Sequence, residues 1–247
     1  MPSAADTALA LRCDPMAQKD TPQPSAFDDP VYRTGVVELL GILAYGEISA
    51  CQRLADDAKM APDLRTKVEI ASMAVAEFQH FELIRDRLVE LGEDPFAAME
   101  PFTSTFERFH RQTAPSDWLE GLVKAYVGDG LASDFYREVA SYLDPQTREL
   151  VLETLSGTGH SEFVVDQVRG AIEADHRVGG RLALWGRRLM GEALSQAQMV
   201  VAERDALSAV IVGGVDQPGM DLAAIGRMFT RLTEAHAERM EKLGLAA

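Results

Sequence analysis

The chain has 247 residues, 47% of them apolar, so it is long enough and apolar enough to bury a sizeable core. Its formal net charge of −15 disfavours non-specific contact with nucleic acid and with anionic membranes. The sequence contains no uninterrupted apolar stretch of about 18 residues. Its start has no basic segment followed by an apolar run. We therefore expect neither a membrane span nor a secretory signal.

Residues 1–28 are rich in Ala, Asp, Pro, Ser and Thr, a composition that predicts a disordered tail. Cys13 lies in this tail and Cys51 lies in a predicted helix, so we expect no stabilising disulfide between them. Reduced thiols are typical of a cytoplasmic protein.

Helical periodicity begins at Val31, where apolar residues start to recur three or four positions apart. The second predicted helix starts near Pro62 and ends at Gly92. Residues 93–116 contain three prolines and an aromatic cluster, which predicts a long connection with room for one short helix. No segment shows the alternation typical of a β-strand.

A third helix is predicted over about 117–143, and Asp144-Pro145 is a strong start signal for a fourth that continues to about residue 175. A fifth helix is predicted over about 178–212 and a last one over about 220–243, with a glycine- and proline-rich turn between them.

The connections after the first and third helices are short, whereas the connection between the second and third is long. Two antiparallel helix hairpins joined by a crossover are the topology of ferritin-like bundles. We therefore predict an all-α protein with a ferritin-like four-helix bundle over residues 29–212, followed by a C-terminal turn and helix over residues 213–247.

The two predicted hairpins resemble each other in sequence. The first contains Ala44-Tyr-Gly-Glu47 and the second contains Ala125-Tyr-Val-Gly-Asp129. Likewise, Glu77-Phe-Gln-His80 in the first corresponds to Gly157-Thr-Gly-His160 in the second. Duplicated hairpins place matching residues around a pseudo-two-fold axis, which is suited to a pair of metal ions.

These residue types match a carboxylate-bridged di-iron site, in which two helices each supply one carboxylate and two others each supply Glu-x-x-His. Residues three apart share one helix face, so both side chains of such a motif can reach one metal. Burying a carboxylate on the apolar face of a helix lowers the stability of the fold unless the carboxylate is paired or binds a metal. The predicted ligands fill five of the six positions: Glu47, Glu77, His80, Asp129 and His160.

The sixth position is Gly157, which has no carboxylate. Glu153, one turn earlier on the same face, and Glu192, on the apolar stripe of the fifth helix, are the candidates to replace it. A single Glu-x-x-His also occurs by chance in many helices, where the histidine is satisfied by a hydrogen bond. The remaining histidines, His110, His176 and His236, are expected to be exposed or in loops. The basic cluster on the fifth helix is expected to be a solvated face rather than a binding patch: Arg181, Arg187 and Arg188.

Over roughly residues 31–212 the chain resembles the ferritin-like hydroxylases of 2-methylthio-isopentenyl-adenosine in tRNA and related actinobacterial ferritin-like proteins. The resemblance depends on Gly46-Glu47, Glu77-Phe-Gln-His80, Gly128-Asp129 and Ser156-Gly-Thr-Gly-His160. It implies two iron ions, molecular oxygen as co-substrate and hydroxylation of a prenyl group on a tRNA base. Gly157 and the shorter Asp129 depart from that family's pattern.

The sequence thus favours an oxygen-dependent di-iron oxidoreductase, a hydroxylase of the tRNA-modifying type, that takes electrons from an external donor. Its acidity argues against binding bulk nucleic acid and leaves a specific modified tRNA loop as the candidate nucleic-acid partner. The alternative is a non-catalytic ferritin-like scaffold, or a single-metal protein that has lost a ligand at Gly157. The sequence does not identify the substrate, and it leaves open whether the chain forms a homodimer.

Overall fold

The computed structural model describes residues 26–155, 161–213 and 219–246, and all regular structure within these ranges is helical. The prediction of an all-α fold is therefore confirmed. The predicted tail, including Cys13, lies outside the described residues except for its end, where Ala26–Asp28 forms the short 3-10 helix η1. Gly157 and His160 also lie outside them.

The first hairpin consists of α1 (Pro30–Asp57) and α2 (Leu64–Glu90), joined by the 3-10 helix η2 (Ala58–Met60). The carboxylate of Asp29 accepts a hydrogen bond from the first turn of α1, and Pro30 occupies a position where its missing N–H costs nothing. Asp63 and Thr66 form a capping box that starts α2. These local signals fix both helix starts.

The long connection contains more helix than the sequence predicted. It consists of α3 (Pro95–Met99), the 3-10 helix η3 (Glu100–Phe102) and α4 (Thr103–Gln112). Asp94 caps the first turn of α3, and Pro95 follows it at the first helical position. Helix α4 has no fully buried residue and packs over α1 and α8.

The second half of the bundle begins with α5 (Trp118–Ala140). The predicted fourth helix is divided into α6 (Pro145–Thr154) and α7 (Ser161–Ala174). The sequence after α6 contains two glycines, whose low helix propensity opposes a continuous helix. Asp144 caps α6 and also accepts a hydrogen bond from the Tyr32 hydroxyl at 2.8 Å, which joins α6 to the start of α1.

The predicted fifth helix is also divided, into α8 (His176–Glu203) and α9 (Asp205–Gly213). The break between α8 and α9 coincides with contacts made by a residue of α1. The Glu38 carboxylate on α1 accepts a hydrogen bond from the Leu207 amide at 3.1 Å and forms an ion pair with Arg204 at 3.6 Å. Glu38 therefore caps the first turn of α9 from another helix. The last helix is α10 (Leu222–Lys242).

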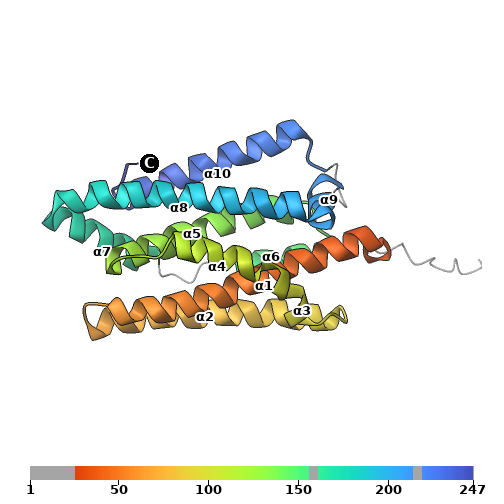
Figure 1. Cartoon of the computed structure of the whole chain (residues 1–247), viewed down its shortest axis with the longest axis horizontal. Helices are drawn as coiled ribbons and strands as arrows, with labels where there is room; N and C mark the ends of the chain where they lie inside the picture. The colour runs from red at the N-terminus through yellow and green to blue at the C-terminus, as the bar shows by residue number, and fades with distance from the viewer. Residues whose placement is uncertain (1–25, 156–160, 214–218, 247) are drawn as a thin grey trace, which may run out of the picture.

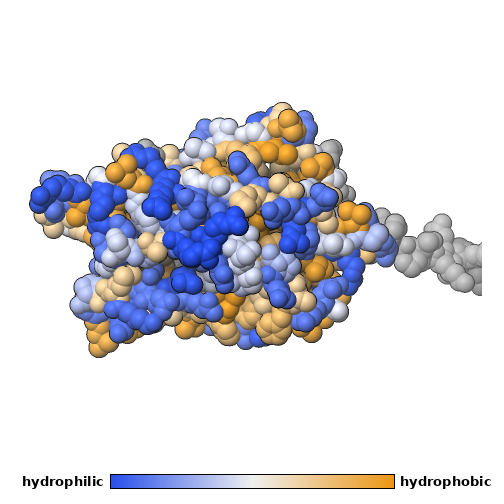
Figure 2. Space-filling view, in the orientation of Figure 1, coloured by the Kyte–Doolittle hydropathy of each residue, from blue (hydrophilic) through white to orange (hydrophobic). Residues whose placement is uncertain are grey.

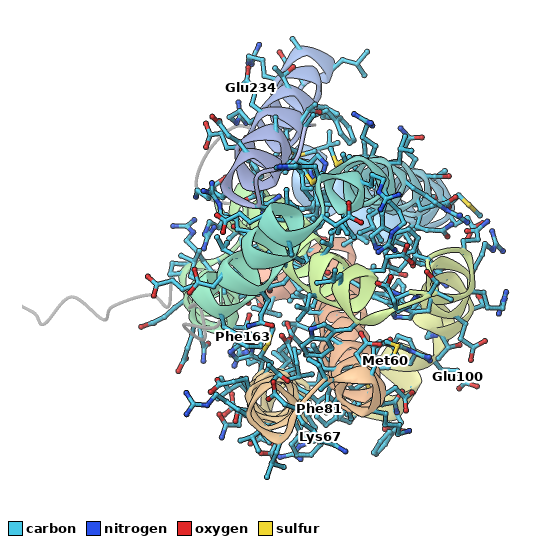
Figure 3. All side chains as sticks on the ribbon, turned by 90° about the vertical axis from the view of Figure 1, so that its left-hand side faces the viewer. Met60, Lys67, Phe81, Glu100, Phe163 and Glu234 are labelled. Carbon is cyan, nitrogen blue, oxygen red and sulfur yellow. The ribbon has the colours of Figure 1, made fainter. Side chains whose placement is uncertain are left out.

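Figure 1 shows the helices running along one long direction, with α1 and α2 side by side at one edge and α8 and α10 at the other. The end-on view in Figure 3 places α2, marked by Lys67 and Phe81, opposite α10, marked by Glu234. Two hydrophobic clusters fill the two ends of the bundle, one around Leu40 and one around Leu182. Polar residues between these clusters therefore lie near the middle of the molecule.

Helix α1 has an unusual composition. Within the described part of the chain, Pro30–Met60 is the one helical segment long and apolar enough to cross a membrane, judged by length and composition alone. Ten residues of α1 are buried in the bundle, so core packing accounts for this apolar character. Figure 2 shows hydrophilic side chains gathered over α4 and α8 and apolar ones scattered around them.

The contact between α1 and α9 depends on the absence of a side chain at Gly35, where an added Cβ would overlap Val210 and the carbonyl oxygen of Ala206. We expect Gly35→Ala to lower the free energy of unfolding by roughly 1–3 kcal/mol, because α9 must move outward. Gly226→Ala is the control, since an added Cβ there meets nothing within 4 Å. It should raise the free energy of unfolding by about 0.5–1 kcal/mol, measured by urea denaturation. Equal effects of the two substitutions would contradict the close packing.

Candidate metal centre

Three of the predicted ligands meet between α1 and α2. Glu47 comes from α1, and Glu77 and His80 come from one face of α2. One ligand atom of each lies within 4.8 Å of the other two. The His80 Nδ1 atom is 3.5 Å from Glu47 Oε2. The side-by-side packing of two helices therefore converts an i, i+3 motif and a separate glutamate into one cluster.

The cluster is largely shielded from water, since the Glu47 side chain is 13% exposed and the His80 side chain is 16% exposed. Among the described residues, no lysine or arginine forms an ion pair with Glu47 or Glu77. Two buried carboxylates without a compensating cation are unfavourable when both are charged.

The protonation of the cluster reflects this cost. The pKa of Glu47 is raised to about 7, mainly by burial; a hydrogen bond shared with Glu77 lowers it, and the nearby Asp129 charge contributes to the rise. Burial also raises the pKa of Glu77 to about 9, together with the hydrogen bond and the charges of Glu47 and Asp129. Without a metal, the pair therefore retains a proton at neutral pH, and a bound cation would displace it.

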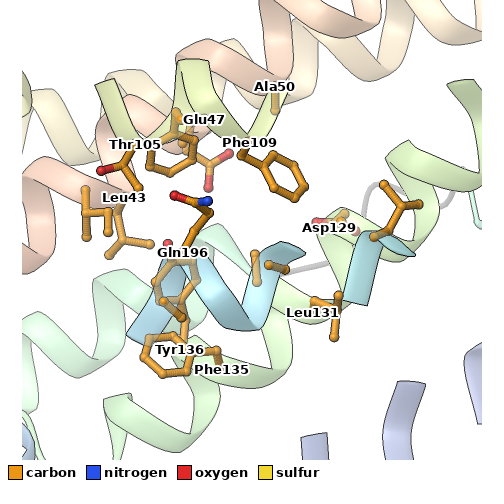
Figure 4. A pocket seen from close by; sticks show the side chains of 18 of the residues that line it. Leu43, Glu47, Ala50, Thr105, Phe109, Asp129, Leu131, Phe135, Tyr136 and Gln196 are labelled. Carbon is orange, nitrogen blue, oxygen red and sulfur yellow. The ribbon is translucent and has the colours of Figure 1, made fainter. Parts of the chain in front are cut away.

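Asp129 lies on α5, across the interior of the bundle from Glu47 (Figure 4). It does not belong to the group whose ligand atoms all lie within 4.8 Å of one another. Although it is exposed at the walls of two pockets, partial desolvation raises its pKa, and the charges of His80 and Arg239 act in the opposite direction. Asp129 is thus electrostatically coupled to the cluster without being part of it.

The two residues proposed to replace the missing carboxylate lie elsewhere. Glu153 is exposed, because the buried face of α6 is formed by Thr147, Val151 and Thr154. Glu192 is half-buried on α8, and its neighbour Ala193 lines the interior in its place. Neither glutamate joins the Glu47 cluster. The fifth predicted ligand, His160, lies outside the described residues.

The cluster opens onto a cavity of about 340 Å³ in the middle of the bundle. Its wall is mostly apolar, and helices α1, α4, α5 and α8 supply most of the lining. Figure 4 shows Glu47, Gln196 and Tyr136 directed into this space. Burial raises the pKa of Tyr136, and the Glu47 charge adds to the effect, so its hydroxyl stays protonated at neutral pH.

Sequence reasoning missed a second polar group at one end of this cavity. His110 on α4, expected to be exposed, is half-buried and lies 2.7 Å from the Ser49 hydroxyl through Nε2. Burial lowers the pKa of His110 to about 3, and the charges of Lys124 and Arg53 add to the effect. The signal was the spacing of Phe106, Phe109 and His110, which places all three on the inner face of α4.

His236 was also expected to be exposed or in a loop, and this was wrong. It is 4% exposed on the inner face of α10, and among the described residues neither ring nitrogen has a hydrogen-bond partner. Desolvation lowers its pKa, as does the charge of Arg239, so it is neutral at physiological pH.

The donor set of the Glu47 cluster has a definite chemical preference. Two carboxylates and one imidazole suit a first-row transition metal, because imidazole is a poor ligand for magnesium and calcium. The carboxylates would balance the charge of a divalent cation, and the apolar cavity would restrict the access of water to it.

Comparison with known proteins agrees with this geometry. A family model described as a ferritin-like domain of actinomycetes matches residues 30–214. The match spans α1 to α9 and so includes every predicted metal ligand, whereas α10 lies outside it. No curated protein matches the chain.

The raised pKa of Glu77 has a consequence for stability. In the metal-free protein this pKa is about 9, against an ordinary value of 4.5, so between these values the folded chain binds more protons than the unfolded chain. The free energy of unfolding should therefore fall as the pH rises through this window. We expect the metal-free protein to be less stable to urea at about pH 8 than at about pH 5.5, and Glu77→Gln to reduce this difference.

The control is Glu100→Gln, which removes an exposed carboxylate outside the Glu47 cluster. It should keep the pH dependence of the unsubstituted protein. An unchanged pH dependence in Glu77→Gln would show that Glu77 is already ionised in the folded state.

Proposed function

Because the chain belongs to the family of actinomycete ferritin-like domains, we propose that it binds iron between α1 and α2 and acts as an oxygen-dependent oxidoreductase. The observation that carries this proposal is the convergence of Glu47, Glu77 and His80 within 4.8 Å at the wall of an apolar cavity. A ferritin-like bundle is a common scaffold for carboxylate-bridged iron pairs, in which ligands project inward from facing helices.

The residues present fit one iron well. Glu47, Glu77 and His80 would hold it, and Asp129 together with His160 would supply the second position of a di-iron pair. The iron, when bound, would supply the activation of molecular oxygen. The electrons would come from an external donor, since the sequence contains no flavin or nicotinamide fingerprint.

The chain itself would provide the surroundings of the reaction. The apolar wall of the cavity would exclude water and hold a substrate against Glu47 and Glu77. Tyr136 keeps its proton and could donate a hydrogen bond inside the cavity. The carboxylates release their shared proton when a cation binds, which couples metal binding to pH.

Within this class we propose a hydroxylase, on the basis of the resemblance to tRNA-modifying enzymes. A broad tRNA surface gains no support from the arginines of α8. Arg181 forms ion pairs with Asp117 at 2.7 Å and with Glu120 at 2.5 Å. Arg188 donates to the carbonyl oxygen of Gln112 at 2.5 Å. These side chains are engaged within the protein, so few cations remain there for phosphate contacts.

A second function has its own support. Glu153 is exposed and Glu192 is half-buried away from the Glu47 cluster, so neither adds a ligand to that cluster. A protein that holds a single metal, or a ferritin-like scaffold that serves in interactions, fits this asymmetry. Iron content and oxygen consumption distinguish these alternatives from a di-iron enzyme.

We expect purified protein to hold fewer than two iron atoms per chain tightly, because one half of the site lacks a carboxylate. His80→Ala should weaken iron binding by at least about tenfold, whereas exposed His176→Ala should leave it unchanged. A Glu153→Ala, Glu192→Ala double variant should also keep its iron. Two tightly held atoms in the unsubstituted protein that fall to one in the double variant would place these glutamates at the metal.

Oxygen consumption tests the catalytic part of the proposal. Protein loaded with ferrous iron without air, then supplied with oxygen and a reductant, should consume oxygen repeatedly. Glu47→Ala should abolish this consumption, because the glutamate lies within 4.8 Å of both α2 ligand atoms. Iron that stays bound without consuming oxygen would favour the single-metal or scaffold function.

Bulk tRNA should not bind measurably at physiological salt, because the net charge of −15 opposes approach and strong binders make roughly six to ten phosphate contacts. A titration against unmodified and prenylated anticodon stem-loops at two salt concentrations provides the measurement. Selective binding of the prenylated loop would support the tRNA-type hydroxylase. Tight binding of both loops with a steep salt dependence would refute the electrostatic argument.

A further inference from the structure

The central cavity is elongated along α1. Its lining includes Leu39 in the first half of the helix and Arg53 near its C-terminal end. At about 1.5 Å per residue, these residues are about 21 Å apart along the helix axis. The Glu47 cluster lies between them. The cavity therefore extends well beyond the candidate metal centre in both directions.

One end of the cavity is apolar. Side chains from α1, α5, α9 and α10 line it, and none of them carries a hydrogen-bonding group: Leu39, Val139, Leu207, Ile211, Phe229 and Leu232. Such a surface favours the apolar body of a ligand, since its burial removes apolar area from water on both sides.

The opposite end is cationic. Arg53 is exposed at the cavity wall and, among the described residues, forms no ion pair or hydrogen bond. Lys124 is 8% exposed, and its Nζ donates to the carbonyl oxygen of Thr113 at 2.8 Å. Asp57 also lines this end, so two cations face one carboxylate and one positive charge remains. Burial lowers the pKa of Lys124 to about 8, which still leaves it mostly protonated at neutral pH.

Within the described part of the chain, a buried amide between the two ends has an unpaired carbonyl oxygen, although its Nε2 donates to Gln112 Oε1 at 3.5 Å. Gln196 is 8% exposed, and among the described residues its Oε1 accepts no hydrogen bond. Figure 4 shows this side chain directed into the cavity toward Glu47. The Nδ1 atom of His110, at the cationic end, is likewise buried without a partner. Unpaired polar atoms in an apolar cavity are costly, and a bound molecule or water that pairs with them removes this cost.

From this distribution we propose that the cavity binds an elongated amphipathic anion, with its carboxylate or phosphate head at Arg53 and Lys124 and its apolar body directed past Glu47 toward Phe229. This orientation brings the middle of the body, rather than either end, against the candidate metal centre. The part of the inference that concerns oxidation of the body rests on the proposed function. The binding part does not, because the cationic and apolar ends contain none of the proposed metal ligands.

Calorimetric titration of the metal-free full chain tests binding directly. Dodecanoate and dodecyl phosphate should bind saturably at one site per chain, and a preference between them identifies the head group. Dodecanol, which lacks the charge, and hexanoate, which lacks the length, should each bind about tenfold more weakly or worse. Binding of dodecyltrimethylammonium as tight as that of dodecanoate would overturn the proposal.

Two substitutions test which part of the ligand binds at each end of the cavity. Arg53→Gln should weaken dodecanoate binding by about tenfold and leave dodecanol binding unchanged, since a charge-assisted hydrogen bond is lost only for the anion. Arg65→Gln, an exposed arginine on α2 outside the cavity wall, is the matched control and should change neither. Ala197→Phe, which fills the apolar path, should weaken binding of dodecanoate and of dodecanol.

Dodecanoate binding that is insensitive to both Arg53→Gln and Ala197→Phe would place the ligand elsewhere and reject the inference. Failure of the protein to hold iron or consume oxygen would reject the proposed function while leaving these titrations unchanged. The two outcomes are therefore separable.

Discussion

The close approach of two carboxylates between α1 and α2, with no lysine or arginine paired to either among the described residues, is the constraint on which the site depends. Burial alone would keep Glu47 and Glu77 partly protonated. A divalent cation resolves the conflict, because it replaces the shared proton and satisfies both side chains. His80 adds the donor that selects a transition metal over magnesium or calcium. The pairing of α1 with α2 is thus both the main packing contact of the first hairpin and the origin of its chemistry.

Sequence patterns predicted the parts of the molecule that local rules control. The spacing of Glu77 and His80 placed them on one face, and Asp144-Pro145 marked the start of a helix. Features set by contacts distant in sequence were missed. The break between α8 and α9 depends on Glu38 of α1, 169 positions from its hydrogen-bond partner Leu207. The burial of His236 depends on how α10 packs, which periodicity alone does not reveal.

The cavity relates the metal centre to the rest of the fold. Its apolar end is formed where α9 and α10 close over α1, and its cationic end where α4 and α5 do so. The division of the predicted fifth helix therefore contributes to the cavity, since α9 supplies Leu207 and Ile211 to its wall. The C-terminal helix, which lies outside the matched family region, also contributes to the wall through Phe229 and Leu232.

Helix α4 differs from the other walls in that none of its residues is fully buried. Its inner face packs on the bundle only through partly buried side chains such as Phe106 and Phe109, and Arg188 donates to the Gln112 carbonyl oxygen at its end. Segments with few buried apolar contacts open at a lower free energy than the whole domain. Exchange of cavity contents would then follow the opening of this crossover, while α1 and α2 keep the ligand cluster assembled. The rate at which molecules enter and leave would thus be set separately from the stability of the centre they reach.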